Sequence, residues 1–305
     1  MRVAVTGAAG RLGRAVVAAL EDAPFTGPWG PIAWPRADFD LDAPESVGGL
    51  LARDRLEAVV HCAAWTDVDG CAREPELAMR RNGEATGVLA RACARAGIDL
   101  VVVSTNEVFD GLRTDGRGYR PDDPTSPPNA YGASKLAGEA AARDAFETGP
   151  GGAQLAIVRT AWLYGPPGDD FPDRILSAAE RARASGEPLR LVADEWGSPT
   201  CTADVADAIA ELLGSGELAG THHVVNAGVA TRAEWAREVL RMADVAVETR
   251  DVSRSEWPRA SNPPAWGVLE PTPLPGGEPL REWRLALADE MPTRVRSRAR
   301  SRGRG

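Results

Sequence analysis

Short apolar runs alternate with longer segments of helical spacing over the first half of the chain. The runs predict strands at residues 2–6, 32–34, 57–62, 99–104 and 155–159. The segments between them predict helices ending near residue 20 and at 45–53, 75–96 and 131–146. Strands that are apolar throughout and alternate with helices are typical of a parallel sheet. The pattern therefore predicts an α/β fold with a doubly wound parallel sheet.

The pattern loosens after residue 160. Helices are predicted at residues 171–185, 203–213 and 232–243, and strands at 189–192 and 222–226. Residues 162–167 and 194–200 are predicted as loops, and the Pro- and Trp-rich residues 257–279 suggest a cap over the sheet. We therefore predict a dinucleotide-binding domain at 1–160. A smaller C-terminal substrate-binding region is predicted at 161–292, with some segments returning to the sheet.

The formal net charge of -9 conceals an arginine-rich end of the chain. Six arginines lie among the last twelve residues, at 294, 296, 298, 300, 302 and 304, so the rest carries -9 - 6 = -15. Such an acidic body argues against a nucleic-acid partner. We expect residues 293–305 to form a solvated, disordered tail, with binding to an anionic partner as the alternative.

Cysteine usage and hydropathy indicate a cytoplasmic protein. The four cysteines form no CxxC pair and no metal-binding spacing, which is typical of reduced thiols. His222 and His223 would point to opposite faces of a strand and cannot share a metal, so no metal site is predicted. No apolar run approaches the ~18 residues of a membrane span, and glycines and arginines interrupt any signal-peptide core. No membrane partner is expected.

A glycine motif follows the first strand at once and precedes a helix. Gly7, Gly10 and Gly13 let the backbone turn tightly and approach a pyrophosphate, and the helix start offers N–H groups to it. We predict that these glycines, with Arg11 and Leu12, bind a dinucleotide; a merely structural turn is the alternative.

The ends of the next two strands bear on the cofactor. No acid follows the second strand, and Arg36 does, which favours NADPH over NADH unless Arg36 is merely solvated. Asp40 lies in a loop expected near the adenine. Ala63 and Ala64, after the third strand, are small enough for a cofactor to pass close to the backbone.

Lys135 is the one lysine among 35 basic residues, so its position requires what arginine cannot provide. Tyr131 stands four residues earlier, on the same face of a predicted helix. A tyrosine beside a lysine is a proton donor whose phenolate the ammonium stabilises. Thr105, at the end of the fourth strand, can bring its hydroxyl to the same carbonyl oxygen, unless it is only a cap or turn residue.

The chain resembles the extended short-chain dehydrogenases/reductases, with a Rossmann-type fold, and within them the dTDP-4-dehydrorhamnose reductase family. The matching stretches are VTGAAGRLG (5–13), AAWTDVD (63–69), EPELA (74–78) with Asn82, STNEVFDG (104–111), YGASKLAGE (131–139), RTAWLYG (159–165) and GSPT (197–200). They extend to about residue 290. YxxxK alone indicates only the superfamily, whereas the later stretches are more specific.

The resemblance implies reduction of the 4-keto group of a nucleotide-linked 4-keto-6-deoxysugar by NADPH or NADH. It makes Tyr131 the proton donor, lets Lys135 hold the nicotinamide ribose and lower the pKa of the tyrosine, and lets Thr105 bind the keto oxygen. Residues implied to contact the substrate are Trp65, Asp69, Thr105, Asn106, Glu107 and Trp162. For Trp162 the alternative is hydrophobic support under the pocket.

Several positions depart from the family. Asn106 and Glu107 stand where the family usually has Asp and Tyr, so the substrate is expected to differ from the usual rhamnose precursor. Trp65 replaces a usual Tyr. Ala15 stands where some members carry a Glu at a metal-bridged dimer interface, so that dimer is not predicted, although a homodimer stays open. Two other functions also stay open: a nucleotide-sugar epimerase or dehydratase, and a non-catalytic, cofactor-binding regulatory subunit.

Overall fold

A six-stranded parallel sheet forms the centre of the larger lobe. The computed structural model describes residues 1–167 and 169–302, with side chains up to residue 298. The strand order is β10-β5-β4-β3-β1-β2, and every neighbouring pair is parallel. The strands are β1 (Val3–Thr6), β2 (Ile32–Trp34), β3 (Ala58–His61), β4 (Asp99–Thr105), β5 (Leu155–Thr160) and β10 (Gly220–His223). The predicted doubly wound α/β fold is confirmed.

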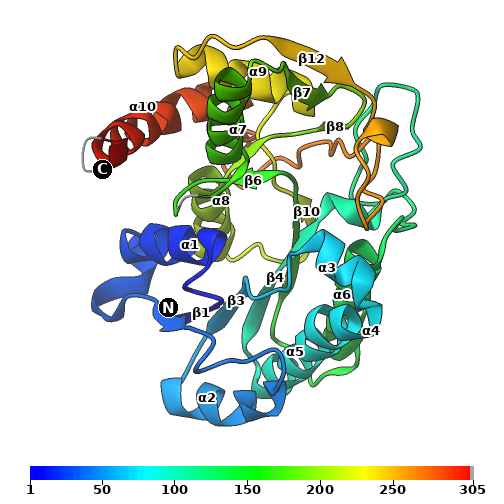
Figure 1. Cartoon of the computed structure of the whole chain (residues 1–305). Coiled ribbons are helices and arrows are strands. Elements are labelled where there is room, and N and C mark those ends of the chain that lie inside the picture. The colour runs from blue at the N-terminus through cyan, green and yellow to red at the C-terminus, as the bar shows by residue number, and fades with distance from the viewer. Residues whose placement is uncertain (168, 303–305) are drawn as a thin grey trace.

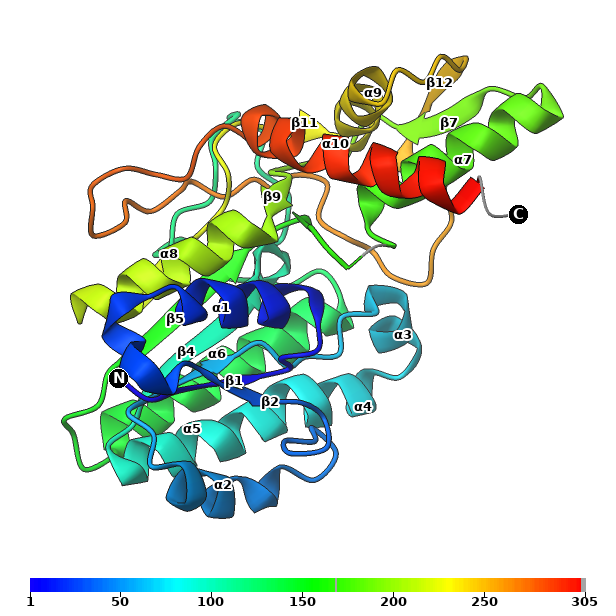
Figure 2. The same cartoon turned by 90° about the vertical axis from the view of Figure 1, so that its left-hand side faces the viewer.

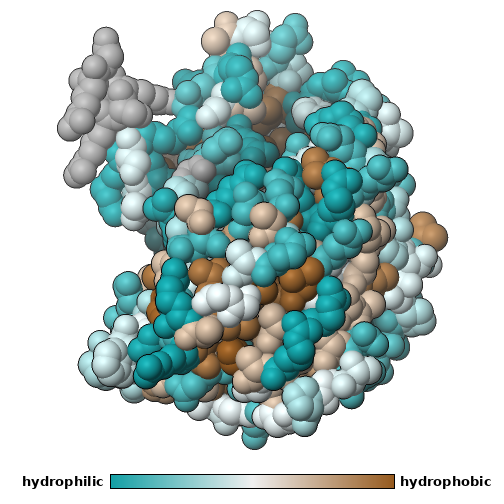
Figure 3. Space-filling view, turned by 90° about the horizontal axis from the view of Figure 1, so that it is seen from below, coloured by the Kyte–Doolittle hydropathy of each residue, from teal (hydrophilic) through white to brown (hydrophobic). Residues whose placement is uncertain are grey.

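Helices cover both faces of this sheet. Apolar side chains of α1 (Arg11–Glu21) and α8 (Thr202–Ser215) pack on one face. Those of α2 (Val47–Asp54), α5 (Ala85–Ala96) and α6 (Ala130–Thr148) pack on the other. Figure 2 shows α1 and α8 above the sheet and α2 and α5 below it. Seen from below, hydrophobic residues show in the middle of the molecule between hydrophilic ones (Figure 3). The burial of both faces explains why the strands are apolar throughout.

A smaller lobe lies above the sheet in Figure 1. Its core is formed by α7 (Phe171–Ser185), α9 (Arg232–Met242) and α10 (Trp283–Arg302) with short strands. The strand pairs are β7 (Leu189–Val192) with β12 (Thr249–Val252), β8 (Trp196–Gly197) with β11 (Ala230–Thr231), and β6 (Leu163–Tyr164) with β9 (Thr200–Cys201). Short 3-10 turns occupy Pro24–Trp29, Pro44–Ser46, Asn106–Val108 and Arg254–Glu256.

Several predicted elements differ in detail. The helix predicted at 75–96 is three pieces, α4 (Pro75–Ala78), a π-helical segment (Met79–Glu84) and α5. Here α6 packs so closely that a Cβ on Gly138 would lie 2.5 Å from the Asn82 carbonyl oxygen. The predicted loops at 162–167 and 194–200 contain strands β6, β8 and β9. Helix α3 (Val68–Arg73), strand β12 and helix α10 were not predicted.

The expected disordered tail is wrong for residues 293–302, because helix α10 continues through them. The Arg294 guanidinium binds the carboxylates of Asp170 and Asp173, and Arg298 binds Glu180. These acidic partners lie at the start and along the side of α7. Arg294 and Arg298, which the sequence placed in a solvated end, thus bind carboxylates of the same chain. Residues 303–305 lie outside the described residues.

Candidate active site

The carboxyl ends of the sheet strands open into a cavity of about 850 Å³ between the two lobes. Its walls come from the glycine turn, the ends of β3, β4 and β5, the start of α6, and α7, β7 and α9. Predicted site residues in this lining are Gly7, Gly10, Arg11, Leu12, Gly13, Ala64, Asp69, Thr105, Asn106, Glu107, Tyr131, Lys135 and Trp162. The lining does not include Arg36, Asp40, Ala63 or Trp65.

The glycine turn needs its glycines for space. Gly7 has a φ of +62°, which favours glycine, and a Cβ on Gly13 would lie 2.2 Å from the Gly7 carbonyl oxygen. Helix α1 begins after Gly10 without a side-chain cap, so its first N–H groups have no partner from a capping residue. Ala63 packs behind the turn, where a Cβ on Gly7 would be 2.8 Å from its backbone.

Arg36 and Asp40 lie together beyond this cavity. The Arg36 side chain is 73% exposed, and its Nε and Nη2 atoms lie 3.3 Å from Asp40 and 3.0 Å from Asp42. Arg81, which the sequence did not single out, binds the same Asp42 carboxylate at 2.6 Å. The charge of Arg36 is therefore already partly neutralised by the two aspartates. Contact of Arg36 or Asp40 with a cofactor stays a prediction.

Tyr131 stands in the first turn of α6, where its neighbours hold it. Asn129 caps the helix by accepting a hydrogen bond from the Gly132 N–H at 2.9 Å. Burial raises the pKa of Tyr131, the nearby Glu107 carboxylate adds to this, and a hydrogen bond with Thr105 opposes it. The resulting pKa is well above 10, so the phenol keeps its proton at neutral pH. This direction is opposite to the lowering that the lysine was expected to cause.

Thr105 has two roles at the end of β4. Its hydroxyl accepts the Glu107 N–H at 3.2 Å, which caps a 3-10 turn, and donates to the Asn106 side-chain oxygen at 3.3 Å. It also lies near enough to Tyr131 to lower the pKa of the phenol. The turn-residue alternative is thus observed together with the contact to the tyrosine. Lys135 lies one helical turn after Tyr131 and is 4% exposed. Burial lowers the pKa of Lys135 to about 8, although the Glu139 charge acts in the other direction.

A buried ion pair that sequence reasoning missed supports this part of α6. Glu139 is fully buried and accepts hydrogen bonds from Arg159 at 2.9 and 2.7 Å. The Ser104 hydroxyl donates to the same carboxylate at 2.6 Å. The ion pair therefore joins α6 to β5, and the Ser104 hydrogen bond joins the end of β4, next to Thr105, to α6 one turn after Lys135. The signal in the sequence that could have indicated this pair was Glu139, a carboxylate four residues after Lys135.

Trp65 is held at the edge of the site by Asn82 of the π-helical segment. The Trp65 N–H donates to the Asn82 side chain at 2.7 Å, and the Asn82 amide donates to the Trp65 carbonyl at 3.0 Å. The same amide donates to the Ser134 hydroxyl at 3.1 Å. Asn82 thus connects the loop after β3 to α6, beside Lys135. π-Helical segments such as this one are frequent at functional sites.

Charged side chains line the other end of the cavity. Glu107 accepts a hydrogen bond from the Asn129 amide at 2.6 Å, and burial raises the pKa of this carboxyl. Arg232 pairs with Glu195 at 3.6 Å, and burial lowers its pKa to about 10. The Arg232 guanidinium lies 3.6 Å from the centre of the Trp162 ring. Sequence reasoning missed Arg232 and Glu195, because no local spacing distinguishes them from surface charges.

Asn106 and Asp69 attach the loop at 257–267 to this end of the site. The Asn106 amide donates to the Gly267 carbonyl at 3.0 Å. The Asp69 carboxylate accepts the Ser261 N–H at 2.9 Å and pairs with Arg259 at 3.3 Å. The Pro- and Trp-rich residues predicted as a cap therefore close this end of the cavity through polar contacts.

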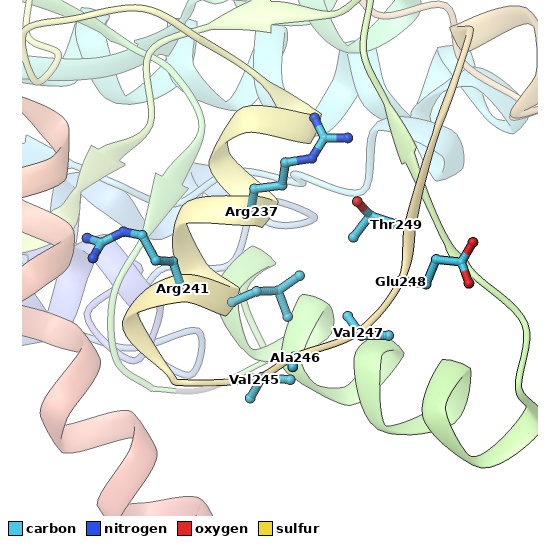
Figure 4. Close-up of a pocket in the computed structure, with 8 residues that line it drawn as sticks. Arg237, Arg241, Val245, Ala246, Val247, Glu248 and Thr249 are labelled. Atoms are coloured by element: carbon cyan, nitrogen blue, oxygen red, sulfur yellow. The ribbon is translucent and has the colours of Figure 1, made fainter.

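A second hollow, of about 540 Å³, lies between the end of α9 and the segment leading into β12 (Figure 4). Arg237 and Arg241 contribute to its lining, and they already bind Asp251 and Glu238. The rest is mostly apolar. None of the predicted site residues lies there, so we assign the site to the larger cavity.

Within residues 1–167 and 169–302, no group of three or more His, Cys, Asp or Glu side chains could hold a metal ion. In the same part of the chain, no helix is both long and apolar enough to cross a membrane. His61 is buried and hydrogen-bonded to the Thr6 and Thr86 hydroxyls at 2.8 and 3.1 Å.

The fold is that of the Rossmann-type reductases and epimerases, and Thr105, Tyr131 and Lys135 line one cavity with the glycine turn. Within that class the chain belongs to the family described as "RmlD substrate binding domain", whose model matches residues 1–295. The expected resemblance is confirmed.

Relatives and solved structures agree with this family. A dTDP-4-dehydrorhamnose reductase from Streptomyces griseus is 39% identical over 94% of this chain and 92% of the relative. A reductase of the same name from Clostridium acetobutylicum superposes with a TM-score of 0.86 at 29% identity, over 96% of this chain and 99% of that one. One from Bacillus anthracis, solved in complex with NADP, gives 0.84 at 31% identity, over 95% and 98%.

Proposed function

We propose that the chain reduces the 4-keto group of a nucleotide-linked 4-keto-6-deoxysugar with NADPH. The observation that supports this most is that Thr105, Tyr131 and Lys135 line one cavity together with the glycine turn. The relatives named dTDP-4-dehydrorhamnose reductase support the substrate class, and the Bacillus anthracis structure supports the choice of NADPH over NADH.

The glycine turn fits the pyrophosphate of such a cofactor. A Cβ on Gly13 would fill the space at the turn, and the uncapped start of α1 directs N–H groups to an anion. The Thr160 hydroxyl is buried in the lining of the cavity and has no hydrogen-bond partner among the described residues, so it is available to a bound polar group. Bound NADPH would supply a hydride. The preference expected from Arg36 stays a prediction, because this side chain is already paired with two aspartates.

The three residues divide the remaining chemistry. Tyr131 donates a proton to the keto oxygen, and its raised pKa keeps the proton available at neutral pH. Thr105 lies beside Tyr131, where it lowers the pKa of the phenol, and we propose that its hydroxyl binds the same keto oxygen. Lys135 lies in the same cavity, where its ammonium can hold the cofactor ribose.

The sugar is proposed to occupy the end of the cavity formed by Asp69, Asn106, Glu107 and Trp162, with Arg232. Asn106 and Glu107 stand where the family usually has Asp and Tyr. We therefore propose that the hydroxyl pattern of the sugar differs from that of the usual rhamnose precursor. Trp65 lies outside the cavity lining, so its substrate contact stays a prediction. We also keep the cytoplasmic location and the homodimer as predictions; the described cysteines are all free thiols.

NADPH oxidation, measured against a panel of nucleotide-linked 4-keto-6-deoxysugars, tests the proposal. We expect turnover with at least one of them and its loss in Tyr131→Phe, with NADPH affinity retained. Stoichiometric NAD⁺ in the purified protein, without such turnover, would instead favour an epimerase or dehydratase. NADPH binding with no turnover on any sugar would favour the regulatory subunit.

A further inference from the structure

Arg294 is a buried arginine outside the lining of the cavity. Its Nη1 and Nη2 atoms donate to the two carboxylate oxygens of Asp170 at 2.8 and 2.6 Å. Nη1 also donates to Asp173 at 2.7 Å. The Arg294 side chain is 8% exposed and that of Asp170 is fully buried. A two-point contact between buried charges fixes both position and orientation of the partner carboxylate.

Asp170 passes this constraint to the loop after β6. Its carboxylate accepts the Gly165 N–H at 2.8 Å and caps α7 by accepting the Asp173 N–H at 3.2 Å. Gly165 has a φ of +148°, and a Cβ there would lie 2.0 Å from the Thr202 hydroxyl oxygen. Asp170 therefore holds the N–H of Gly165, and Thr202 at the start of α8 leaves no room for a side chain at this residue.

The Gly165 carbonyl in turn holds a residue of the glycine turn. The Arg11 Nε donates to this carbonyl at 2.9 Å, and its Nη2 donates to the Pro167 carbonyl at 3.3 Å. Arg11 is the first residue of α1 and lines the cavity. A continuous series of hydrogen bonds thus connects α10 to the start of α1 through Arg294, Asp170, Gly165 and Arg11.

We propose that Arg294 is a positioning residue for the cofactor, which orients Arg11 through Asp170 and Gly165 at the start of α1. This rests on the proposed function only in taking NADPH as the cofactor. Arg11 alone could choose among several rotamers, and two backbone carbonyls of the smaller lobe select one. A side chain that is already ordered loses less entropy when the anion binds. Helix α10, which holds the last arginine-rich residues described, thereby contributes to cofactor affinity.

The test compares Arg294→Gln with two variants of the same helix. Arg298→Gln removes contacts to Ser177, to Glu180 and to the Asp173 carbonyl, and leaves the contacts of Arg294 to Asp170 in place. Arg296→Gln removes a contact to Thr293 within α10. The Kd for NADPH is measured by fluorescence titration. We expect Arg294→Gln to raise it roughly tenfold, as happens when a residue that orients a ligand-binding side chain is lost. The two control variants should stay within about twofold of the wild-type Kd.

Two further measurements separate positioning from general loss of structure. Hydrogen exchange on the cofactor-free protein should show faster exchange of the Gly165 amide in Arg294→Gln and not in Arg298→Gln. In an Arg11→Gln background, Arg294→Gln should have little further effect on the Kd, because both act through one contact. Arg294→Lys keeps the charge but offers only one contact point. Its Kd for NADPH should lie between those of the wild type and Arg294→Gln.

Equal effects of Arg294→Gln and Arg298→Gln on the Kd, or additive effects of Arg294→Gln and Arg11→Gln, would overturn the proposal. An unchanged exchange rate of the Gly165 amide in Arg294→Gln would also overturn it. Binding and exchange are read without the sugar, so a failure of the proposed reduction would appear only in the turnover assay and leave these results interpretable.

Discussion

The guanidinium of Arg232 lies 3.6 Å from the centre of the Trp162 ring, inside the cavity that holds Tyr131. The two residues come from different elements, the start of α9 and the turn before β6. Trp162 has a φ of +44°, which a bulky side chain rarely adopts, and strained backbone of this kind is concentrated at functional sites. The stacked pair therefore forms a flat, charged wall at the proposed sugar end.

Arg232→Lys should weaken sugar binding although it keeps the charge. A lysine ammonium cannot stack on the Trp162 ring as a planar guanidinium does. We expect KM for the sugar nucleotide to rise about tenfold, equivalent to about 1.4 kcal/mol, with the Kd for NADPH unchanged. Steady-state kinetics and a cofactor titration measure the two quantities. An equal loss of NADPH affinity would contradict the assignment of Arg232 to the sugar end.

Glu107→Gln should reduce kcat/KM for the sugar nucleotide. The Glu107 carboxylate faces the cavity beside Tyr131, and a hydrogen bond from a substrate hydroxyl to a charged group contributes about 1.5–3 kcal/mol. We expect a loss of roughly tenfold or more. Glu76→Gln, the same change at an exposed position of α4, serves as the matched control and should leave the kinetics unchanged. Unchanged kinetics in Glu107→Gln would remove this carboxylate from substrate recognition.

The affinity for NADPH should fall as the pH rises through about 8. Burial lowers the pKa of Lys135 to about 8, so the ammonium is present below that pH and is lost above it. Lys135→Met should bind NADPH more weakly and with no such step. Titrations at pH values from about 6.5 to about 9.5 span the transition. A wild-type Kd that is constant over this range would show that the Lys135 charge does not contribute.

Lys135→Met should also stabilise the cofactor-free protein at neutral pH. Folding lowers the pKa of Lys135 from 10.5 to about 8, so the folded state disfavours the charge, and the full penalty applies below pH 8. At 1.36 kcal/mol per unit the gain is of order 3 kcal/mol at pH 7. It should shrink as the pH rises from 8 towards 10.5, where the unfolded lysine also loses its proton. Urea unfolding at two pH values measures the gain, and a destabilised variant at pH 7 would contradict the prediction.

Glu139→Gln should destabilise the fold, because it leaves the Arg159 charge buried without its partner. Removing one member of a buried pair costs about 3–5 kcal/mol. Burial alone would raise the pKa of Glu139, but Arg159 and Ser104 outweigh it and lower the pKa. The stabilisation is thus present at neutral pH and is lost as the pH falls below 4.5. The wild type and the variant should therefore differ less in acid than at pH 7. Glu139→Gln combined with Arg159→Met should recover part of the loss, as measured by denaturant unfolding.

The alternation of apolar runs with helical segments predicted the parallel sheet, because helices bury both faces of each strand. The glycine turn could be predicted for the same local reason, since strand, turn and helix follow each other directly. Tyr131 and Lys135 stand four residues apart, so one helix turn already brings them together. Features of this kind depend on contacts within a few residues.

Other features depend on partners far away in sequence. Residues 293–302 look like a solvated tail by composition, but Arg294 binds the carboxylates of Asp170 and Asp173, more than a hundred residues earlier. Arg232 and Glu195 resemble surface charges until the smaller lobe folds over the sheet. The sign of the Tyr131 pKa shift also needed the structure, because burial and Glu107 act against the lysine effect that the sequence suggested.

The sequence by itself determined the parallel α/β sheet, the glycine turn and the tyrosine–lysine pair, because backbone periodicity and helical spacing are local properties. Only the tertiary structure decided which charges line the sugar end, which side chains lie outside the cavity and how α10 reaches the glycine turn. Those relationships arise when two lobes close on one another, and no spacing along the chain records the distance between them.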